Sequence, residues 1–376
     1  MPVIGPRMSV DLALPAGIDA SRILGFQMRN GKTAQEIIAE AAAIIGTVNE
    51  RVMARYRAIS FLTPLQYAMY AQGQGARETP VKVEGKQADP VRSDTLGHML
   101  PLRDYEDANA WTPLYLRDAW DAQITADLQL IADSWEARVD GDVLRRIFSN
   151  AENPIGSAGY DVPWAIGSGV NVPYIPPQTP GWPAFDSTHS HFVTQSGTWN
   201  AANAAALLEK MVVHLIHHGH TGRLLGLVSG ADVSIYKAIT GGKFVELLPS
   251  GVTMVTGGSN PVAVASGETT GAPGEVFGLY RSDAGPVVEL RSIQRIPTKY
   301  LFLTKSYGEN SIRNGLAIRE HPATGFGLRV DPQLTRSIQP ELEYVQFKAV
   351  HGVGVNDRLN GVVGQGGTES YTPPTI

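Results

Sequence analysis

The chain has no cysteine among its 376 residues and comparatively few charged residues. Disulfide bonds and thiolate chemistry are therefore excluded, and a reducing compartment is permitted. Charged residues make up 18% of the chain and hydrophobic residues 43%, a globular balance with a rather dry surface. Because the centres of protein interfaces are depleted of charge, such a surface is expected where a chain lies against other subunits. The length allows two or three domains.

Long apolar runs and basic runs are also missing. No stretch approaches ~18 consecutive apolar residues, so we expect no membrane span. The opening sequence MPVIGPRMSVDLALPAG has no basic segment followed by a long apolar one, so we expect no signal peptide. The formal net charge is −5, and no Lys/Arg run supplies the basic face that binding to nucleic-acid phosphates requires.

The motifs of nucleotide sites and hydrolase sites are incomplete. No G-x-x-x-x-G-K-[ST] sequence occurs, and the pairs Gly73/Gly75 and Gly167/Gly169 do not complete a dinucleotide-binding fingerprint. Ser229 lacks the spacing of a nucleophile elbow. We therefore predict that the protein is not an enzyme and that it has no catalytic residues, no cofactor and no metal site.

Histidine supplies an enzyme-like alternative. Six histidines fall within a short part of the chain: His189, His191, His214, His217, His218 and His220. Three of them share a predicted helix at spacings of three and four, so a metal-dependent hydrolase using the His214/His217/His218 cluster is the alternative function. We favour a capping role, because histidines near a helix C-terminus commonly bond to its last carbonyl groups and no carboxylate completes the set.

The longest predicted element is a spine helix over residues 112–150. Its apolar residues recur at the period of one helix face: Leu116, Trp120, Ile124, Leu128, Ile131, Trp135, Val139, Leu144 and Ile147. Thr112 is a suitable N-cap, and Pro113 suits the first turn. We expect this face to be packed along its length and Gly141 to be a candidate break.

Further helices and strands are predicted on either side of the spine. Thr33-x-x-Glu36 is a capping-box pattern that opens a helix over 33–56, and a second amphipathic helix covers 199–219 with Gly219 at its end. A short helix is predicted at 231–239. Strands are predicted at 224–228, 244–248, 252–255, 287–296, 299–304, 326–330, 341–350 and 353–358.

Three segments have little regular pattern. Residues 67–110 are predicted to form a long hairpin with too few apolar residues for a core of its own. Residues 152–197 interleave prolines with aromatic residues, which is typical of an ordered loop folded over a subunit surface. The tail from Gly364 is predicted to be flexible.

Three stretches near the C-terminus carry a family likeness. VVELRSIQRIPTKYLFL at 287–303 looks like a strand, Ile-Pro turn, strand passage, GLAIREHP at 315–322 looks like the short segment that follows it, and LEYVQFKAVHGVGVNDRLNGVV at 342–363 looks like a closing strand pair. Together with the order of the predicted elements, they resemble the major capsid protein of tailed double-stranded-DNA phages, which has the Hong Kong 97-like fold.

The resemblance implies an α+β chain with five parts. These are an N-terminal arm and helix (1–66), an extended E-loop hairpin (67–110), a P-domain spine helix with the Pro/aromatic-rich loop (111–198), a mixed α/β A-domain (199–325), and P-domain closing strands with a flexible tail (326–376). Some relatives join a hairpin lysine to an asparagine of a neighbouring subunit. Lys82 and Lys86 lie in the hairpin, and Asn356 and Asn360 in the closing strands, but we predict no cross-link, because exposed loop lysines ordinarily only solubilise.

The resemblance also implies a function. A major capsid protein self-assembles into hexamers and pentamers that form an icosahedral shell around double-stranded DNA, in a virion assembled in the host cytoplasm. The implied partners are other copies of the chain, with portal, scaffolding and decoration proteins, and the DNA is enclosed without sequence-specific binding. An encapsulin-like protein nanocompartment is the alternative within the same fold.

Overall fold

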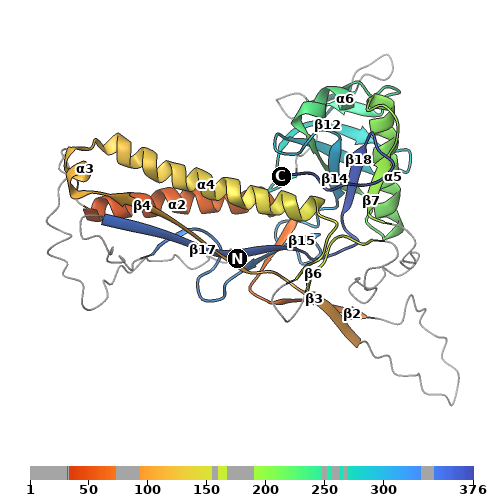
Figure 1. The fold of residues 1–376 in the computed structure, drawn as a ribbon. Coiled ribbons are helices and arrows are strands. Elements are labelled where there is room, and N and C mark those ends of the chain that lie inside the picture. The colour runs from red at the N-terminus through yellow and green to blue at the C-terminus, as the bar shows by residue number, and fades with distance from the viewer. Residues whose placement is uncertain are drawn as a thin grey trace. The chain divides into compact units, whose positions relative to one another are not determined.

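The structure is a computed structural model that describes residues 32, 34–72, 94–154, 160–166, 190–247, 252–255, 262–265, 269–331 and 343–376 (Figure 1). It has two compact units. The first comprises Met1–Glu50, Asp104–Ala137 and Gly327–Val350, and the second comprises Arg51–Arg103, Arg138–Phe326 and His351–Ile376. The predicted N-terminal arm up to residue 31 and the capping residue Thr33 lie outside the described residues. No helix in the described ranges is both long and apolar enough to span a bilayer.

Two helices supply the buried faces of the first unit. They are α2 (Ala34–Tyr56), which confirms the helix predicted over 33–56, and α4 (Asp121–Phe148). Within this unit the buried side chains recur every three or four residues, as one helix face requires: Ile37, Ala41, Ile45, Val48, Ile124, Leu128, Ile131 and Trp135. The Trp135 indole N–H donates to the Asn49 amide oxygen at 3.1 Å, so a polar bond also ties α4 to α2.

Three strands complete the first unit. β16 (Arg329–Asp331) and β4 (Arg103–Trp111) both pair with β17 (Glu343–Val355). The prediction that residues 103–110 belong to the hairpin is therefore wrong. The reason is that β4 carries anchors for α4: Tyr105 packs edge-on against Trp135 with ring centroids 6.2 Å apart, and the Trp111 indole N–H donates to Asp127 at 3.0 Å.

The predicted spine helix is two helices rather than one. A short helix, α3 (Pro113–Asp118), ends at Ala119, whose backbone is extended with ψ 147°, and α4 then begins. The side-chain oxygen of Gln123 accepts the Trp120 N–H at 2.8 Å, which satisfies a backbone donor at the start of α4. The prediction that Trp120 lies on the packed face is wrong, because the extended residue turns it out to 59% exposure.

Two local predictions were made for the spine, an N-cap at Thr112 and a break at Gly141, and only the first is confirmed. Thr112 is the N-cap of α3 as predicted, since its hydroxyl accepts the Tyr115 N–H at 3.1 Å. The predicted break at Gly141 is wrong, because α4 runs through it. Its neighbours Val139 and Val143 are fully buried, and that packing overrides the low helix propensity of glycine.

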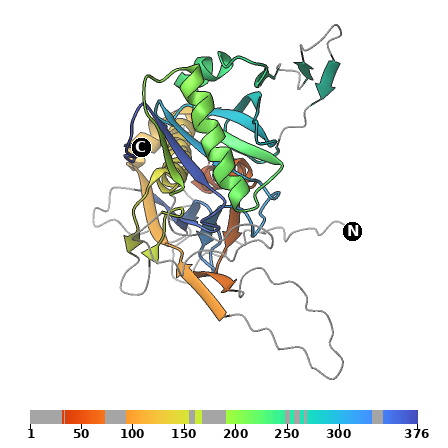
Figure 2. The ribbon, with the colours of Figure 1, turned by 90° about the vertical axis from the view of Figure 1, so that its right-hand side faces the viewer.

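A seven-stranded mixed sheet forms the core of the second unit (Figure 2). In order across the sheet, its strands are β7 (Phe192–Gln195), β18 (Val362–Gly366), β14 (Tyr300–Thr304), β8 (Arg223–Ser229), β13 (Val287–Ile293), β12 (Glu275–Arg281) and β9 (Phe244–Glu246). β8 pairs in parallel with β13, and β7 with β18, while the other neighbours are antiparallel. The strands predicted at 224–228, 287–296 and 299–304 are confirmed.

One face of this sheet is covered by helix α5 (Ala201–His217), which crosses it in Figure 2. Its buried residues follow the amphipathic pattern predicted over 199–219 and are Ala204, Leu207, Leu208, Met211, Val212 and Leu215, while Ile216 is only partly buried. The predicted role of Gly219 at the helix end is confirmed by its φ of 80°, which favours glycine. A 3₁₀ turn, η2 (Gly230–Asp232), and α6 (Val233–Lys237) stand where the short helix was predicted.

The opposite face packs against other parts of the same unit. Trp164, fully buried, lies against Phe302 with ring centroids 5.2 Å apart. Phe148, at the end of α4, meets Tyr300 edge-on at 5.9 Å. The sheet is thus covered on both faces, which explains why β8 is buried at six of its seven positions.

Strand β18 overturns the predicted flexible tail. Its residues Val362 and Val363 are fully buried, and Gly364 pairs with Leu301 of β14. A Cβ at Gly366 would lie 2.1 Å from the Trp199 ring. Glycine is needed here for close packing rather than for freedom of the chain.

The two closing strands predicted at 341–350 and 353–358 are one strand, β17. Gly352 lies between the two predicted strands. A Cβ at Gly352 would come within 1.9 Å of the Pro101 carbonyl oxygen, so this glycine allows another segment to approach the strand.

The remaining strands form small pairings. β1 (Ser60–Thr63) pairs in parallel with β15 (Leu316–Glu320), which pairs antiparallel with the end of β17. β2 (Tyr67–Gln72) and β3 (Asp94–Met99) form the base of a hairpin, so the predicted hairpin is confirmed over these residues. The other two-strand pairs among the described residues are β10 (Val252–Val255) with β11 (Val262–Ala265), and β5 (Asn153–Pro154) with β6 (Tyr160–Asp161).

Candidate functional site

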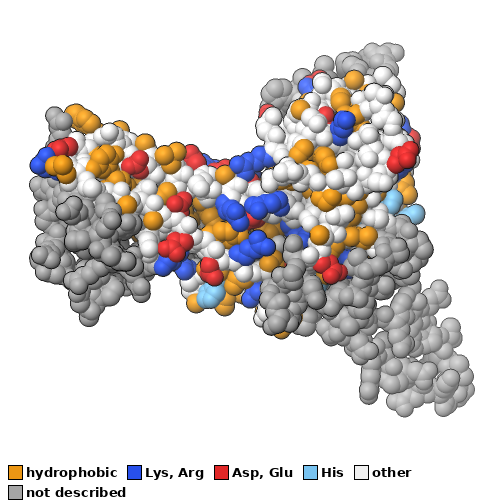
Figure 3. Space-filling model, in the orientation of Figure 1, with side chains coloured by type: hydrophobic (Ala, Val, Ile, Leu, Met, Phe, Trp, Pro, Cys, Tyr) orange, Lys and Arg blue, Asp and Glu red, His pale blue; other side chains and the backbone are white. Residues whose placement is uncertain are grey.

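Basic side chains gather on one stretch of the face that Figure 3 shows, with acidic side chains beside them. In the second unit the Asp142 carboxylate accepts from Arg138 at 3.2 Å and from Arg145 at 2.7 Å. Asp140 accepts from Arg55 at 2.6 Å. Arg55, Arg138 and Arg145 are each paired with a carboxylate, so they attract a polyanion only weakly.

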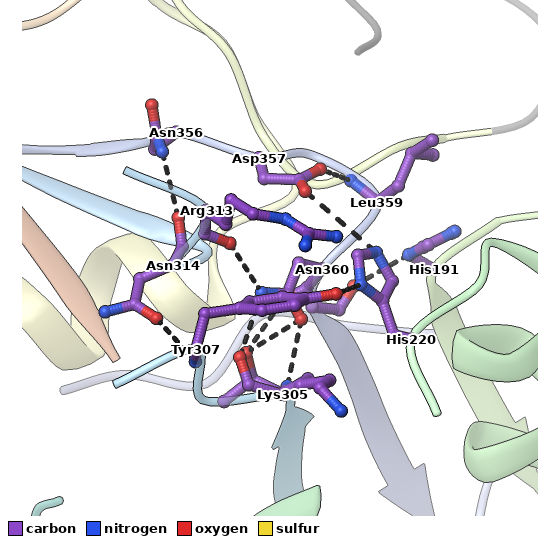
Figure 4. Close-up of polar contacts among 12 residues, drawn as sticks. His191, His220, Lys305, Tyr307, Arg313, Asn314, Asn356, Asp357, Leu359 and Asn360 are labelled. Atoms are coloured by element: carbon purple, nitrogen blue, oxygen red, sulfur yellow. Dashed lines mark hydrogen bonds and ion pairs between the residues drawn. The ribbon is translucent and has the colours of Figure 1, made fainter. Parts of the chain in front are cut away.

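A polar junction holds together separate segments of the second unit (Figure 4). It comprises the loop 305–314 after β14, the turn 356–361 between β17 and β18, and His220 ahead of β8. The Asn360 amide donates to the carbonyls of Lys305 and Arg313, both at 3.0 Å, and its oxygen accepts the Lys305 N–H at 2.9 Å. Every polar atom of this buried side chain therefore holds the loop to the turn.

Two more asparagines extend the junction. The Asn356 amide donates to the carbonyls of Ile312 at 2.6 Å and Asn314 at 2.9 Å. The Asn314 amide donates to the Ser60 carbonyl at 2.9 Å, which brings β1 into the network. Asn356 and Asn360, named above for a cross-link that was not predicted, are both buried and fix the backbone of their own subunit.

His220, Tyr307 and Asp357 form the ionisable part of the junction. The Tyr307 hydroxyl lies 2.8 Å from His220 Nδ1, and His220 Nε2 lies 4.0 Å from Asp357 Oδ2. The Arg313 guanidinium stands 4.0 Å from the centre of the Tyr307 ring, a cation–π distance.

Burial sets the charge states at the junction. It lowers the pKa of His220 to about 3, helped by the positive charges of Arg313 and Lys305. It raises the pKa of Asp357 to about 6, against hydrogen bonds from backbone N–H groups. His220 is therefore neutral at pH 7 and forms no ion pair with Asp357. A histidine this weakly basic, 4.0 Å from the carboxylate, is a poor general base, so the junction is better suited to fixing loops than to catalysis.

The structure divides the predicted histidine cluster, although His214 and His218 both lie near His191, with ring centroids 6.1 Å and 5.0 Å from it. His214 Nδ1 lies 2.8 Å from the Lys210 carbonyl of its own helix, and His217 is exposed. His218 is buried and stacks on His191 at 5.0 Å, and His191 Nδ1 meets the Gly361 carbonyl at 2.7 Å. Within the described residues no three His, Cys, Asp or Glu side chains are grouped to hold a metal ion.

Trp164 and its neighbours pack beside the junction, a contact that the sequence did not predict. The Trp164 indole N–H donates to the Ile147 carbonyl at the end of α4 at 2.8 Å. Arg358, fully buried, donates through Nε to the Pro163 carbonyl at 2.7 Å. Trp164 therefore packs inside its own subunit rather than over the surface of another. A tryptophan directly after a proline in a proline-rich segment was the available signal.

A second buried charge network lies in the sheet. Glu289 is fully buried and contacts Arg223 at 2.6 Å and Arg291 at 2.7 Å. Arg291 also donates to the carbonyls of Thr269, Ala272 and Gly274, which fixes the loop ahead of β12. A hollow of about 650 Å³ opens beside Arg223, lined by Ile216, Thr221, Gly222, Arg223, Ala284, Gly285, Pro286 and Val287. These residues include no nucleophile paired with a base.

Comparisons with known proteins place the fold. No protein-family model matches the chain, and no curated protein sequence matches it. A solved chain of Mycobacterium phage Patience is 19% identical, covers 92% of each chain and superposes with a TM-score of 0.63. This chain has the fold of the Patience phage chain. The expected resemblance to phage capsid proteins is thereby confirmed at the level of the fold.

More distant solved structures were also found. The capsid of Cyanophage P-SCSP1u is 8% identical over 82% of this chain and 86% of that one, with a TM-score of 0.45. The capsid of a native GTA particle is 12% identical over 86% and 91% of the two chains, with a TM-score of 0.47.

Proposed function

We propose that this chain is a major capsid protein, which assembles into hexamers and pentamers of an icosahedral shell around double-stranded DNA. The observation that carries the proposal is the fold shared over 92% of both chains with a phage chain. At 19% sequence identity the comparison supports a shared fold only, and the assembly and the enclosed DNA are inferred from that fold.

Features of the described residues support a shell subunit. The β2–β3 hairpin carries Tyr67 at its base, 52% exposed, beside the exposed Leu65. Exposed apolar side chains at the root of a two-stranded hairpin suit a contact with a neighbouring subunit, because such a hairpin has little stability of its own. The matched charges around Asp142 suit a wall that encloses DNA without binding a sequence.

Under this proposal the parts of the chain keep their expected roles. Residues 1–66 are the arm and first helix, 67–102 the E-loop, 111–198 the P-domain spine with its loop, 199–325 the A-domain, and 326–376 the closing segment. Strand β4, which was expected in the hairpin, pairs with the closing strand β17 instead. Portal, scaffolding and decoration proteins, and assembly in the host cytoplasm, rest on the fold likeness alone. No observation among the described residues favours an encapsulin-like compartment or a metal-dependent hydrolase.

Electron microscopy of the expressed chain tests the proposal. Shells are expected from the full chain, with nuclease-protected DNA when they are made in phage-infected cells. A variant in which a short turn replaces residues 73–93 keeps β2 and β3 paired and should fold as subunits that do not form stable shells. Protein that stays monomeric under every assembly condition would contradict the proposal. A co-purifying protein cargo instead of DNA would indicate a nanocompartment, and stoichiometric zinc lost in a His214→Ala/His218→Ala variant would indicate the hydrolase.

A further inference from the structure

The polar junction contains two of the three Asn-Gly sequences of the chain. They are Asn314-Gly315 and Asn360-Gly361, and the third is Asn30-Gly31. An asparagine followed by glycine is especially prone to deamidation, because glycine has no side chain that hinders its backbone nitrogen. Both junction asparagines are fully buried, so this chemistry is placed inside the fold.

The packing of the second unit requires both glycines. A Cβ at Gly315 would lie 2.6 Å from the Asn360 carbonyl oxygen and 3.1 Å from the Trp164 ring, and a Cβ at Gly361 would lie 2.4 Å from that ring. A larger residue after either asparagine would slow deamidation, but it would not fit without overpacking. Protection of the two asparagines therefore has to come from the folded structure.

Hydrogen bonds hold both side-chain amides in place. The Asn314 amide donates to the carbonyls of Ser60 and Gly308, both at 2.9 Å, and its oxygen accepts the Tyr307 N–H at 3.0 Å. Asn360 is held in the same way by the loop after β14 (Figure 4). Deamidation requires the amide carbon to turn toward the next backbone nitrogen, which breaks these bonds, so the closed junction should suppress the reaction.

The two Asn-Gly sequences are held by the same contacts. The Asn360 amide donates at 3.0 Å to the carbonyl of Arg313, the residue directly before Asn314. The Asn356 N–H donates at 2.7 Å to the carbonyl of Gly315, the residue directly after it. An opening that separates the loop from the turn therefore releases both asparagines together.

We propose that Asn314 and Asn360 are coupled deamidation sites, which react only when the junction opens and then prevent it from closing. In the open junction the Gly361 nitrogen loses its proton and attacks the side-chain amide carbon of Asn360. The new C–N bond closes a succinimide ring, and the side-chain nitrogen leaves as ammonia. Water then opens the ring at either carbonyl and gives aspartate or isoaspartate. Asn314 reacts in the same way with the nitrogen of Gly315.

The product does not fit the closed junction. An aspartate at position 360 would place a carboxylate oxygen against the carbonyls of Lys305 and Arg313, to which the amide donates at 3.0 Å. Two donated hydrogen bonds are thereby replaced by repulsion between oxygens in a buried place. Isoaspartate also lengthens the backbone of the turn. A subunit that has reacted once therefore stays open, and its second asparagine is left accessible. Both sites belong to the single subunit, so their reaction does not depend on shell assembly.

Mass spectrometry of peptides from the full chain tests the protection. Unassembled subunits are kept in mildly alkaline buffer with and without denaturing urea, and the conversion of each amide to an acid is followed over time. In urea, Asn314 and Asn360 should react at the rate of Asn30, which lies outside the described residues and serves as the reference for an unfolded Asn-Gly sequence. Without urea both should react more than about tenfold more slowly. Equal rates with and without urea would overturn the inference.

The Asn360→Asp variant tests the coupling, because it carries one of the two products. Without urea its Asn314 should deamidate at a rate close to that in urea. Asn310→Asp is the matched control in the same loop. Asn310 is exposed, and its side-chain oxygen accepts the Leu62 N–H at 2.6 Å, a bond that aspartate keeps. Asn314 should stay protected in this control. Parental protection of Asn314 in folded Asn360→Asp protein would contradict the coupling.

Intact masses test the coupling without the product variant, in case Asn360→Asp does not fold. In Asn30→Gln protein only two Asn-Gly sequences remain, Asn314-Gly315 and Asn360-Gly361. In urea below the unfolding transition, single molecules should carry both conversions or neither more often than independent reactions would give. Conversions distributed independently between the two sites would overturn the coupled mechanism.

Discussion

Arg146 and Asp161 form a buried ion pair, with Arg146 Nη1 at 2.9 Å from Asp161 Oδ2 and side chains only 3% and 2% exposed. Arg146 stands in the last turn of α4 and also donates to the carbonyls of Ser149 and Ala151 just beyond it. One guanidinium thus satisfies carbonyls at the helix end and holds β6, which lies in the proline-rich segment, against that end.

Removing the carboxylate of this pair should be strongly destabilising. Asp161→Ala leaves the Arg146 charge buried without its main partner, a change that costs about 3–5 kcal/mol of unfolding free energy. Urea unfolding of unassembled subunits measures it. Asp118→Ala is the control, since it breaks an exposed pair and should change the midpoint little. Equal midpoints for the two variants would show that burial of the Arg146 pair does not matter.

At neutral pH the ionised Asp357 should make the subunit less stable than an asparagine at the same position would. Burial raises the folded-state pKa of Asp357 to about 6 from 3.8, so the folded form holds its proton more tightly than the unfolded form. Stability from this group is present below the unfolded value and is lost as pH rises through about 6. The side chain is 19% exposed, and the loss amounts to up to about 3 kcal/mol.

Asp357→Asn removes that penalty and keeps an oxygen for the Leu359 N–H, which Asp357 accepts at 3.0 Å. The variant should be the more stable protein at pH 7, with a gain that shrinks towards pH 4. Thermal unfolding at both pH values checks this. A gain of the same size at pH 4 would mean that the effect is not the ionisation of this carboxyl.

His98 should have the opposite dependence on pH. Burial, with the charges of Arg358 and Arg146 nearby, lowers the pKa of His98 to about 4 in the folded state. The unfolded chain therefore binds the proton first, and stability falls as pH drops from about 6.5 to 4, by about 3 kcal/mol for this group. His98→Gln should flatten the slope of stability against pH over that range. A slope that His98→Gln leaves unchanged would show that His98 does not cause the loss of stability.

The elements that could be read from the sequence are those whose local pattern matches their packing. The amphipathic helix α5 was predicted correctly, because it lies on one side of a sheet and its apolar positions repeat every three or four residues. Strand β8 was found for a similar reason, since a short apolar run is typical of a strand covered on both faces.

The predictions that were wrong concern positions whose surroundings are set by residues distant in the sequence. Gly366 looked like part of a loose tail, and only the Trp199 ring packed against it shows why a glycine stands there. Trp120 fitted the apolar period of the spine, and the break that exposes it is made by the extended backbone of Ala119. The polar junction was missed because Asn356 and Asn360 bond to backbone groups 42 to 55 residues away, which no local pattern records.

Two glycine substitutions distinguish a position that has space for a side chain from one where close packing requires glycine. In the middle of α4, a Cβ at Gly141 would meet only the flexible guanidinium of Arg145, at 3.3 Å, so Gly141→Ala should stabilise the subunit by about 0.5–1 kcal/mol. At Gly361 a Cβ would lie 2.4 Å from the buried ring of Trp164, so Gly361→Ala should cost about 1–3 kcal/mol through overpacking. Thermal unfolding of the two variants beside the parent measures both effects. A lower melting temperature for Gly141→Ala would mean that the helix needs glycine there for a reason other than space.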